Sequence, residues 1–371
     1  HLIGSPLALA DEAYAERAWV PYADMAALTS TSKITVLQGS ATSIDPAAKI
    51  ATVSLHHQHS EKHSQKHSQK HIPYDYLIVA TGLRRVWPVV PQSLTRAAYL
   101  AEARAHISAV RAAASWHDHA GIVVVGGGAV GIEMAAELKL THPAARVTLV
   151  HSHEQLLSSE ALPDEAKDVA LGLLHEAGVE TLLGTRVAGT REIVNNKTQT
   201  LTQVTLTNGH TILASAVIKA ISHSRPSTSF LPCSALDPAT GLIRAQPNLM
   251  FPDDGAVLPN AASHFAVGDA VRWSGIKRCG AAMHFGYIAA HNIHEKTNKR
   301  SKRYEPAFKE LGEIPPMIGL AVGKKAMSYS PGQGVAAGED VMKAYFGDDL
   351  GFDICWRYMK LGLPVGREEK E

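Results

Sequence analysis

The sequence has few cysteines, no long apolar run and almost no net charge, and each of these shortages excludes a class of protein. Its three cysteines, Cys233, Cys279 and Cys355, form no CxxC or CxxxxC pair. This spacing argues against a zinc knuckle and against a redox-active dithiol close in sequence. No apolar run approaches the roughly 20 residues that a membrane-spanning helix needs. No charged-then-apolar signal segment opens the chain, so we expect a reducing, cytoplasmic setting.

Length and composition indicate a globular protein of several domains. The 371 residues are too many for one ordinary hydrophobic core, so two or three domains are expected. A hydrophobic content of 45% and a charged content of 19% are typical of soluble proteins. The net charge of +1 provides no overall field to attract nucleic acid or an anionic membrane. Because the first residue is His1, we also expect a fragment or a processed product.

The order of apolar patterns predicts an α/β fold with a parallel sheet. Alternating patterns predict strands early in the chain, a helical period follows, and strands and helices then alternate. The predicted strands lie within residues 33–45, 49–55, 72–82, 121–125, 146–150, 179–187, 202–221 and 264–270, and the predicted helices within residues 101–116, 126–142, 163–180 and 280–295. Asn208-Gly209 is a type I′ hairpin signal within residues 202–221.

A histidine-rich repeat interrupts the early strands. Residues 56–71, "HHQHSEKHSQKHSQKH", repeat the tetrapeptide His-Ser-x-Lys and are polar almost throughout. Imidazole is a common metal ligand, and helical spacing would align these histidines on one face. However, no cysteine or aspartate completes a fixed site, so we interpret the segment as a solvated insertion at a hairpin tip. We predict no metal site.

The stretch "GIVVVGGGAVGIEMAAEL", residues 121–138, carries the strongest functional signal. Gly126, Gly128 and Gly131 form a Gly-x-Gly-x-x-Gly run between a predicted strand and a predicted helix. The first glycine permits a tight turn, the second lets the backbone approach a pyrophosphate, and the third allows close packing of helix and strand. The helix N-terminus then faces the phosphates. This context predicts a dinucleotide-binding site.

The residue after the next strand bears on which nicotinamide dinucleotide is bound. An acidic side chain at that point binds the ribose hydroxyls of NAD, whereas a basic or neutral one admits the 2′-phosphate of NADP. Here the strand is followed by "HSH", with His151 at the acidic position. Two interpretations stay open: an exposed histidine without a role, or tolerance of NADPH. Either NADPH or NADH is a candidate coenzyme.

Three segments together resemble a flavoprotein family. "DYLIVATG" (residues 75–82), "GIVVVGGGAVGIE" (121–133) and "HFAVGDA" (264–270) stand in the order and spacing of a protein that binds two dinucleotides. The chain resembles the pyridine nucleotide-disulfide oxidoreductase superfamily, in the branch containing apoptosis-inducing-factor-like proteins and ferroptosis suppressor protein. Further stretches, among them "LPDEAKD" and "GIKRCGAAMHFG", are similar to fungal members of that branch.

The resemblance implies a fold and three domains, one of them in two segments. It implies two Rossmann-like, three-layer dinucleotide-binding domains of the glutathione-reductase type, with a small C-terminal α+β unit. The FAD domain would be discontinuous and would lack its first βαβ unit. The expected domains are residues 1–90 and 229–300 for FAD, 91–228 for NAD(P)H, and 301–371 for the C-terminal unit.

The resemblance also implies residues at the flavin. Thr81 and Gly82 of the "ATG" motif would lie near the flavin, and Gly268 and Asp269 would end a strand. The Asp269 carboxylate would accept hydrogen bonds from ribityl hydroxyls; its alternative role is that of a helix N-cap. The helix after Gly280 would direct its N-terminal dipole at the flavin.

Two residues are candidates for a catalytic role. Glu133 resembles the acid that such families place near the nicotinamide, but an acid is also favoured in the first turn of any helix. Lys277, like Arg278 beside it, would contact the flavin side of the site or be solvated.

The chain departs from the family pattern in three ways. It has no cysteine pair to lie against the flavin, so electrons would leave the flavin directly for an external acceptor. Leu7 in "SPLA" stands where relatives tend to have an arginine. The first Gly-x-Gly-x-x-Gly unit, which holds the ADP half of FAD, does not precede His1. Two accounts of this difference compete: an N-terminal piece is missing, which we favour, or the unit has been lost.

These observations lead to one favoured function and one alternative. We expect a flavin-dependent NAD(P)H:acceptor oxidoreductase that passes electrons to a quinone-like small molecule. The alternative is a non-catalytic nucleotide-binding protein that has lost flavin and acts through partners in cell death or signalling. Peripheral contact with a membrane, including that of mitochondria, fits the sequence, as does either a monomer or a homodimer. Nucleic acid is not an expected partner, because "HEKTNKRSKR" (residues 294–303) is the only basic run.

Overall fold

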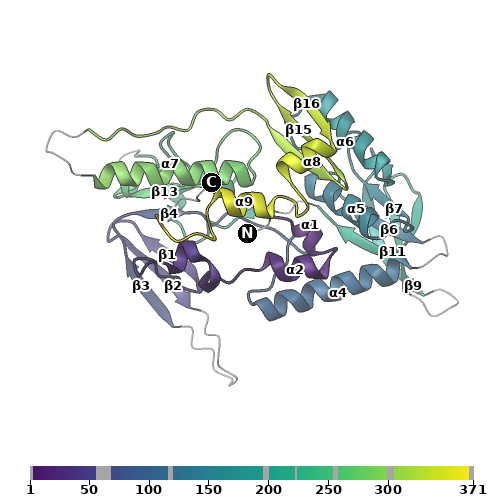
Figure 1. Ribbon diagram of the computed structural model, residues 1–371, viewed down its shortest axis with the longest axis horizontal. Coiled ribbons are helices and arrows are strands. Elements are labelled where there is room, and N and C mark those ends of the chain that lie inside the picture. The colour runs from purple at the N-terminus through teal and green to yellow at the C-terminus, as the bar shows by residue number, and fades with distance from the viewer. Residues whose placement is uncertain are drawn as a thin grey trace. The chain divides into compact units, whose positions relative to one another are not determined.

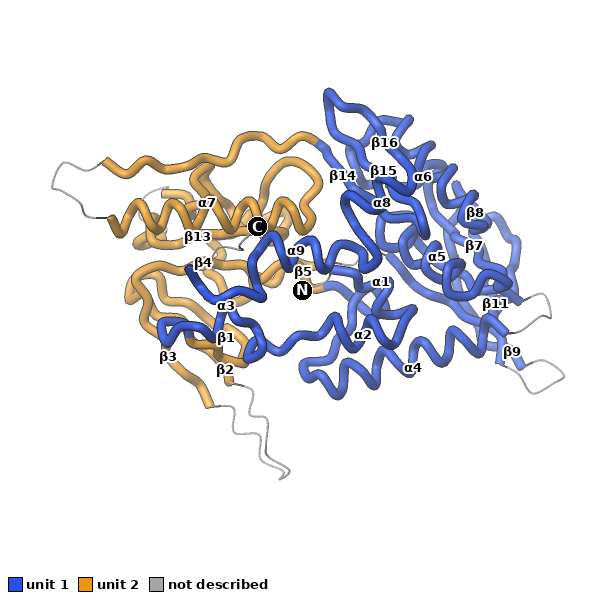
Figure 2. Tube along the Cα trace, in the orientation of Figure 1, with its two compact units in different colours: residues 1–34, 85–223, 316–371 blue, residues 35–84, 224–315 orange. Residues whose placement is uncertain are grey.

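The computed structural model describes residues 3–55, 68–115, 120–194, 200–221, 224–253, 258–298 and 305–366. The chain forms two compact units, each assembled from segments far apart in sequence (Figure 2). Unit 1 comprises residues 1–34, 85–223 and 316–371, and unit 2 comprises residues 35–84 and 224–315. The three domains proposed from the sequence, with the FAD domain in two segments, stay predictions.

A six-stranded sheet forms the centre of unit 1, in the order β8-β7-β6-β11-β10-β9. The strands β8, β7, β6 and β11 pair in parallel, and β10 and β9 extend the sheet antiparallel. Their bounds are β6 (Gly121–Val125), β7 (Val147–Val150), β8 (Glu180–Leu182), β9 (Val187–Val194), β10 (Thr200–Leu206) and β11 (Thr211–Lys219). The parallel half confirms the predicted α/β architecture.

The parallel strands are short and apolar because both of their faces are covered. Ile122, Val123 and Val124 of β6 are at most 1% exposed, and all four residues of β7 are buried. A strand covered on both faces needs apolar side chains at every position, unlike a half-exposed strand that alternates. The hairpin predicted at Asn208-Gly209 is confirmed, since it joins the antiparallel strands β10 and β11. The predicted type I′ turn is wrong, because that turn needs a positive φ at both residues and only Gly209, with a φ of 84°, has one.

Helices cover the sheet of unit 1, and a second sheet packs onto two of them (Figure 1). The helix α4 contacts β6 and β11, and α5 contacts β6 and β7. The antiparallel sheet β14-β15-β16 packs on α5 and α6. These elements are α4 (Arg96–Ala114), α5 (Ala129–Thr141), α6 (Asp164–Glu176), β14 (Ile318–Val322), β15 (Lys325–Ser330) and β16 (Gly334–Gly338).

Residues near the two ends of unit 1 are joined by polar contacts. The Tyr14 hydroxyl donates to the carbonyl oxygen of Asp349 over 3.0 Å, and Arg17 pairs with the Asp349 carboxylate at 2.9 Å. Burial, followed by the nearby Asp349 carboxylate, raises the pKa of Tyr14 well above its usual value. Tyr14 and Arg17 lie in α2 (Glu12–Ala18), and Asp349 lies between α8 (Glu339–Tyr345) and α9 (Phe352–Tyr358). The other short helices near the N-terminus are α1 (Ser5–Ala8) and α3 (Ala26–Thr29).

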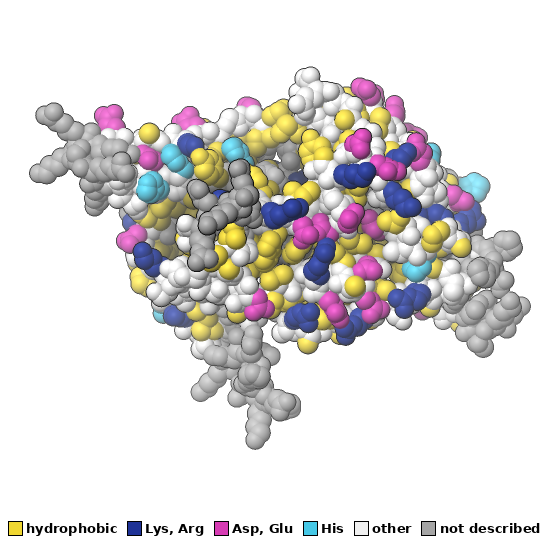
Figure 3. All heavy atoms as spheres, in the orientation of Figure 1, with side chains coloured by type: hydrophobic (Ala, Val, Ile, Leu, Met, Phe, Trp, Pro, Cys, Tyr) yellow, Lys and Arg dark blue, Asp and Glu magenta, His cyan; other side chains and the backbone are white. Residues whose placement is uncertain are grey.

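Charges of both signs intermingle on the face of unit 1 formed by α2 and α4. Arg104 pairs with Glu16 at 2.6 Å, and Arg111 lies 3.6 Å from Glu12. Figure 3 shows basic and acidic side chains interspersed over these helices. This mixing agrees with the near-zero net charge and favours solubility over attraction of a polyanion.

Unit 2 contains three small sheets and one long helix. The sheets are the antiparallel meander β1-β2-β3, the parallel pair β4-β13 and the antiparallel pair β5-β12. The elements are β1 (Gly39–Asp45), β2 (Ile50–Leu55), β3 (Gln69–Pro73), β4 (Leu77–Val79), β5 (Leu83–Arg84), β12 (Arg225–Pro226), β13 (His264–Ala266) and α7 (Cys279–Thr297). The strands predicted within residues 33–45 and 49–55 are confirmed as β1 and β2. The single strand predicted within residues 72–82 is wrong, because residues 72–73 end β3 and residues 77–79 form β4 in a different sheet.

The core of unit 2 is built around three phenylalanines and one buried amide. Phe251, Phe265 and Phe285 are completely buried in one apolar cluster. Asn292 of α7 is also completely buried, and its amide donates to the carbonyl oxygens of Asn248 and Lys309, both at 2.9 Å. These bonds attach two irregular segments to α7, as a buried amide requires partners for its polar atoms.

The structure also bears on the predictions about membrane spans and about the histidine repeat. None of the described helices is long and apolar enough to cross a membrane. Residues 56–67 of the histidine repeat lie outside the described residues, and residues 69–73 form β3. In the described ranges, no group of three or more His, Cys, Asp or Glu side chains is arranged to hold a metal ion.

Candidate functional site

The glycine loop between β6 and α5 is shaped by close backbone packing. The Gly126 N–H donates to the carbonyl oxygen of Val150 over 2.8 Å, and Gly126 has a φ of 120° that favours glycine. A Cβ on Gly126 would lie 2.6 Å from the carbonyl oxygen of Ala220, and one on Gly131 would collide with the carbonyl oxygen of Gly126. The first and third glycines of the run are therefore required by the fold.

The middle glycine of the pattern faces open space instead. A Cβ on Gly128 would meet no atom within 4 Å, and its φ of −79° is accessible to other residues. Gly128 is the N-cap of α5, and no side chain caps that helix end. The N-terminus of a helix carries partial positive charge and unpaired N–H groups. This arrangement fits a pyrophosphate approaching the loop at Gly128.

His151 lies against the glycine loop from the end of β7. Its Nδ1 accepts a hydrogen bond from the Gly127 N–H at 3.1 Å, and its Nε2 lies 3.0 Å from the Ser158 hydroxyl. Burial lowers the pKa of His151, and the neighbouring His153 lowers it further. The ring is therefore not exposed, as one of the two interpretations from the sequence had it, because it is half-buried with a partner on each nitrogen. A role for His151 in coenzyme binding stays a prediction.

Two glutamates lie one turn apart on α5. The predicted Glu133 is half-buried near the start of the helix and has interaction partners in the structure. Glu137 is only 3% exposed, and burial raises the pKa of its carboxyl group to about 7. The sequence analysis missed Glu137. Its signal is the spacing of four residues from Glu133 within an otherwise apolar helix, which places both acids on one side.

In unit 2 the structure brings the "ATG" and "GD" motifs to the same sheet edge. β4 and β13 pair in parallel, so Thr81 and Gly82 after β4 lie at the same edge as Gly268 and Asp269 after β13. The Thr81 hydroxyl donates to the carbonyl oxygen of Ser227 over 2.7 Å. Ligands of open parallel sheets bind at the carboxyl ends of strands. The pairing thus places all four residues beyond the same ends of the two strands, and their contact with a flavin stays a prediction.

The environment of Asp269 argues against its alternative role as a helix N-cap. Asp269 lies in the short 3₁₀ turn Gly268–Ala270, whose N-cap is Val267. The N-cap of α7 is Arg278, and no side chain caps that end. Asp269 is half-buried at the end of β13, where a carboxylate can accept hydrogen bonds from a bound polyol.

Lys277 supports the turn that carries Asp269. Its Nζ donates to the carbonyl oxygen of Asp269 at 3.3 Å and more closely to that of Val271. Burial lowers the pKa of Lys277, whereas the Asp269 carboxylate raises it. The Lys277 amine therefore binds backbone carbonyl groups of the turn. A catalytic role for Lys277 stays a prediction.

The three cysteines form no disulfide. Cys233, Cys279 and Cys355 are all free, and the last two are partly buried. Cys279 is the first residue of α7, and Cys355 lies in α9.

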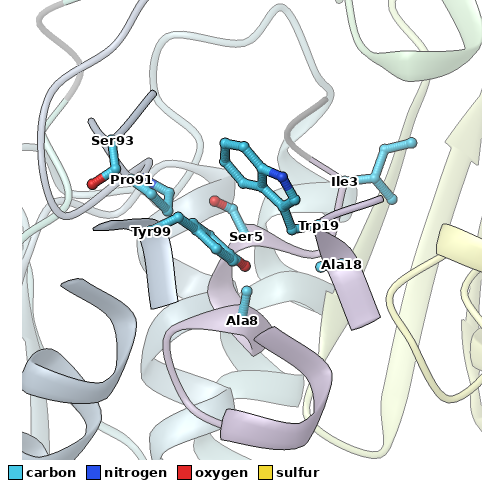
Figure 4. Close-up of a pocket in the computed structure, with 8 residues that line it drawn as sticks. All are labelled: Ile3, Ser5, Ala8, Ala18, Trp19, Pro91, Ser93 and Tyr99. Atoms are coloured by element: carbon cyan, nitrogen blue, oxygen red, sulfur yellow. The ribbon is translucent and has the colours of Figure 1, made fainter. Parts of the chain in front are cut away.

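A separate cavity lies among the N-terminal helices of unit 1. It has a volume of about 210 Å³ and lies where Trp19 and Tyr99 pack with ring centroids 5.0 Å apart (Figure 4). Ser5 also lines it, but the Ser5 hydroxyl donates to the carbonyl oxygen of Val89. The glycine loop does not contribute to this cavity, so it adds nothing to the dinucleotide site.

Comparison with known proteins identifies the family. The model of the pyridine nucleotide-disulphide oxidoreductase family matches residues 7–286, which include both the glycine loop and the "GD" motif. The chain belongs to this family. The resemblance inferred from the sequence is thereby confirmed. The family uses FAD with NADH or NADPH, so the predicted cofactors are those of the family.

Curated relatives place the chain within the family. The chain is 48% identical over 366 residues to the oxidoreductase OXR1 of Ajellomyces capsulatus, covering 98% of this chain and 74% of that protein. It is 34% identical over 147 residues to human ferroptosis suppressor protein 1, covering 40% of this chain and 38% of that protein.

Solved structures share the fold. A NAD-dependent persulfide reductase from A. fulgidus matches with a TM-score of 0.56 and 21% identity, over 86% of this chain and 51% of that one. The water-forming NADH oxidase of Lactobacillus brevis, bound to NADH, matches with a TM-score of 0.52 and 18% identity, over 78% of this chain and 57% of that one. The chain therefore spans a little more than half of each, and the fold of FAD- and NAD(P)-dependent oxidoreductases is confirmed.

The residues present fit the two cofactors to different extents. The open space at Gly128 and the uncapped α5 fit a nicotinamide dinucleotide. The cluster at the ends of β4 and β13, with the uncapped N-terminus of α7, fits the flavin and ribityl portion of FAD. The sequence has one Gly-x-Gly-x-x-Gly run, and it lies in unit 1. The residues that fit FAD are thus those for its flavin end.

Gly128→Ala separates binding from folding at the glycine loop. We expect the variant to fold, with a change in stability of at most about 1 kcal/mol, because the new methyl group meets no protein atom, and because the weaker N-cap that alanine makes is offset by the lower entropy of its unfolded chain. We expect NADPH binding to weaken by roughly tenfold or more, about 1.4 kcal/mol, since that methyl group stands where the pyrophosphate approaches. Calorimetric titration and thermal unfolding measure both quantities.

Gly172→Ala in α6 is the matched control, because its methyl group also meets open space. It should bind NADPH like the wild type. Equal NADPH affinity of Gly128→Ala and Gly172→Ala would rule out the glycine loop as the pyrophosphate site.

Lys277→Met tests the support of the Asp269 turn. Losing two hydrogen bonds to backbone carbonyls should destabilise the protein by about 1–3 kcal/mol and should weaken retention of FAD by the full-length protein. The measurements are the thermal midpoint and the flavin that remains after gel filtration. Lys70→Met, at an exposed position on β3, is the control. If the two variants retain flavin equally, Lys277 does not support a flavin site.

Proposed function

We propose that this protein is a flavin-dependent NAD(P)H:acceptor oxidoreductase that delivers electrons to a quinone-like small molecule without a redox-active disulfide. One observation carries the proposal: a chain of this family contains two arrangements suited to a dinucleotide. In the first, the uncapped N-terminus of α5 lies behind the open space at Gly128. In the second, the half-buried Asp269 carboxylate follows β13, which pairs in parallel with β4. The first arrangement suits a nicotinamide dinucleotide, and the second suits the flavin end of FAD.

Residues of unit 1 would hold and orient the coenzyme. Gly126 and Gly131 bring α5 against β6, so the helix N-terminus faces the ligand at Gly128. Its N–H groups would bind the pyrophosphate and offset its negative charge. Glu133, near the start of the same helix, is the proposed acid beside the nicotinamide.

Residues of unit 2 would hold the flavin end of FAD. Asp269 would accept hydrogen bonds from the ribityl hydroxyls, and Lys277 would keep the turn that carries Asp269 in place. Thr81 and Gly82 would lie at the same edge. The N-terminus of α7 would stabilise negative charge on a reduced flavin. FAD, when bound, supplies the hydride acceptor and the electron donor that amino-acid side chains lack.

The acceptor is proposed from the cysteines and from what a flavin donates. The free cysteines at positions 233, 279 and 355 form no disulfide that could relay electrons. Electrons would therefore pass from the flavin to a small molecule that accepts two electrons and two protons, which is the chemistry of a quinone. The NADH oxidase that shares this fold is described as water-forming, so dioxygen is the competing acceptor.

The full-length protein should be yellow, and its flavin absorbance should bleach when NADPH is added without oxygen. NADH should also bleach it, because the pyrophosphate that the glycine loop would bind is common to both coenzymes, and no carboxylate immediately follows β7 to repel the 2′-phosphate of NADPH. A short-chain quinone added anaerobically should restore the absorbance, with one flavin reoxidised per quinone. Stopped-flow absorbance follows all three steps.

A colourless full-length protein would contradict the enzymatic function and would favour a non-catalytic nucleotide-binding protein. The protein could instead be yellow, be bleached by either coenzyme, and be reoxidised by dioxygen but not by quinones. This result would support an oxidoreductase and would contradict a quinone-like acceptor.

A further inference from the structure

The contacts of His151 determine its protonation state. The Gly127 N–H can only donate, so the Nδ1 atom that it contacts at 3.1 Å must carry a lone pair. The proton of the neutral ring then resides on Nε2 and is donated to the Ser158 hydroxyl at 3.0 Å. Both nitrogens of His151 are used within the protein, and neither is left to contact a ribose.

The same ring explains why residue 127 is a glycine. A Cβ on Gly127 would lie 2.7 Å from Cγ of His151 and 2.7 Å from Cδ2 of Leu156. No left-handed φ is required at Gly127, so space alone demands glycine at that position. The imidazole therefore occupies the space that a side chain on residue 127 would need.

The segment after β7 holds both polar groups of residue 127. The carbonyl oxygen of Gly127 accepts a hydrogen bond from the Leu157 N–H at 2.8 Å, while its N–H donates to His151. Leu157 itself is completely buried and has a φ of 54°, an uncommon conformation for leucine that holds its N–H toward the loop. We call His151, Leu157 and Ser158 the loop clamp.

We propose that His151 is a positioning residue that fixes the glycine loop for pyrophosphate binding and does not discriminate between NADH and NADPH. It stands where a carboxylate would contact the adenosine ribose, but its ring is turned to the loop. Holding the Gly127 peptide sets the direction of the next N–H groups, those of Gly128 and the first turn of α5. Coenzyme affinity then depends on His151 through the pyrophosphate, which both coenzymes share. This inference rests on the proposed binding of the nicotinamide coenzyme.

Two variants of His151 test the proposal in the full-length protein. His151→Ala removes the acceptor for the Gly127 N–H, and His151→Asn keeps an acceptor oxygen near the position of Nδ1. We expect His151→Ala to weaken binding of NADP⁺ and NAD⁺ by the same factor, roughly tenfold, and to raise KM for NADPH and NADH equally with little change in kcat. His151→Asn should stay within about threefold of the wild type for both.

His153→Ala is the control, because this exposed neighbour packs near the His151 ring, with centroids 5.5 Å apart, and makes no side-chain hydrogen bond to the loop. It should bind both coenzymes like the wild type. Calorimetric titration gives the dissociation constants, and circular dichroism shows that each variant is folded. Should His151→Ala not fold, the comparison of His151→Asn with His151→Leu, which matches its size but accepts no hydrogen bond, replaces it.

The outcomes are distinct. A loss confined to NADP⁺ would overturn the proposal and make His151 a contact to the 2′-phosphate. Unchanged affinity for both coenzymes in His151→Ala, or equal affinity of His151→Asn and His151→Leu, would also overturn it. A wild-type protein that binds neither coenzyme would instead refute the proposed function.

Discussion

The close approach of α5 to the end of β6 is the constraint on which the dinucleotide site depends. Gly131 lies against the carbonyl oxygen of Gly126, and Gly126 lies against that of Ala220, so neither position has room for a side chain. This packing brings the first turn of α5 directly behind the loop. The helix N–H groups then point into the space left open at Gly128, where an anion gains from the helix dipole.

The segments around that packing serve to keep the loop in one shape. β7 contributes the carbonyl oxygen of Val150 to the Gly126 N–H, and the residues after β7 bind the peptide groups of Gly127. The sheet itself is buried on both faces and gives these segments fixed positions. A loop held in this way loses little conformational freedom when a ligand binds, so more of the interaction energy appears as affinity.

The two units place their candidate residues by the same structural rule. In unit 1 the glycine loop follows the parallel strand β6, and His151 follows its neighbour β7. In unit 2 Thr81 follows β4, and Asp269 follows its parallel partner β13. Parallel pairing brings the carboxyl ends of neighbouring strands together, which is why residues nearly 190 positions apart form one cluster in unit 2.

Much of the fold and the location of the site could be predicted from the sequence, because those features have local signals. The Gly-x-Gly-x-x-Gly run stood between an apolar strand and a helix, and Asn208-Gly209 marked its hairpin. The contacts of single side chains could not be predicted. The direction of the His151 ring depends on Ser158 and Gly127 at once, and the position of Lys277 depends on carbonyl groups of a turn. The burial of Glu137 depends on packing by other elements around α5.

The central claim is that the loop from Gly126 to Gly131 binds the nicotinamide dinucleotide. The most direct measurement is a titration of NADP⁺ into protein labelled with ¹⁵N at its 29 glycines, followed by NMR of the amide groups. We expect saturable shifts of the Gly127, Gly128 and Gly131 amide signals, whereas the signal of Gly209 at the distant hairpin turn should not shift. Binding that leaves the three loop amides unchanged while other glycines shift would contradict it.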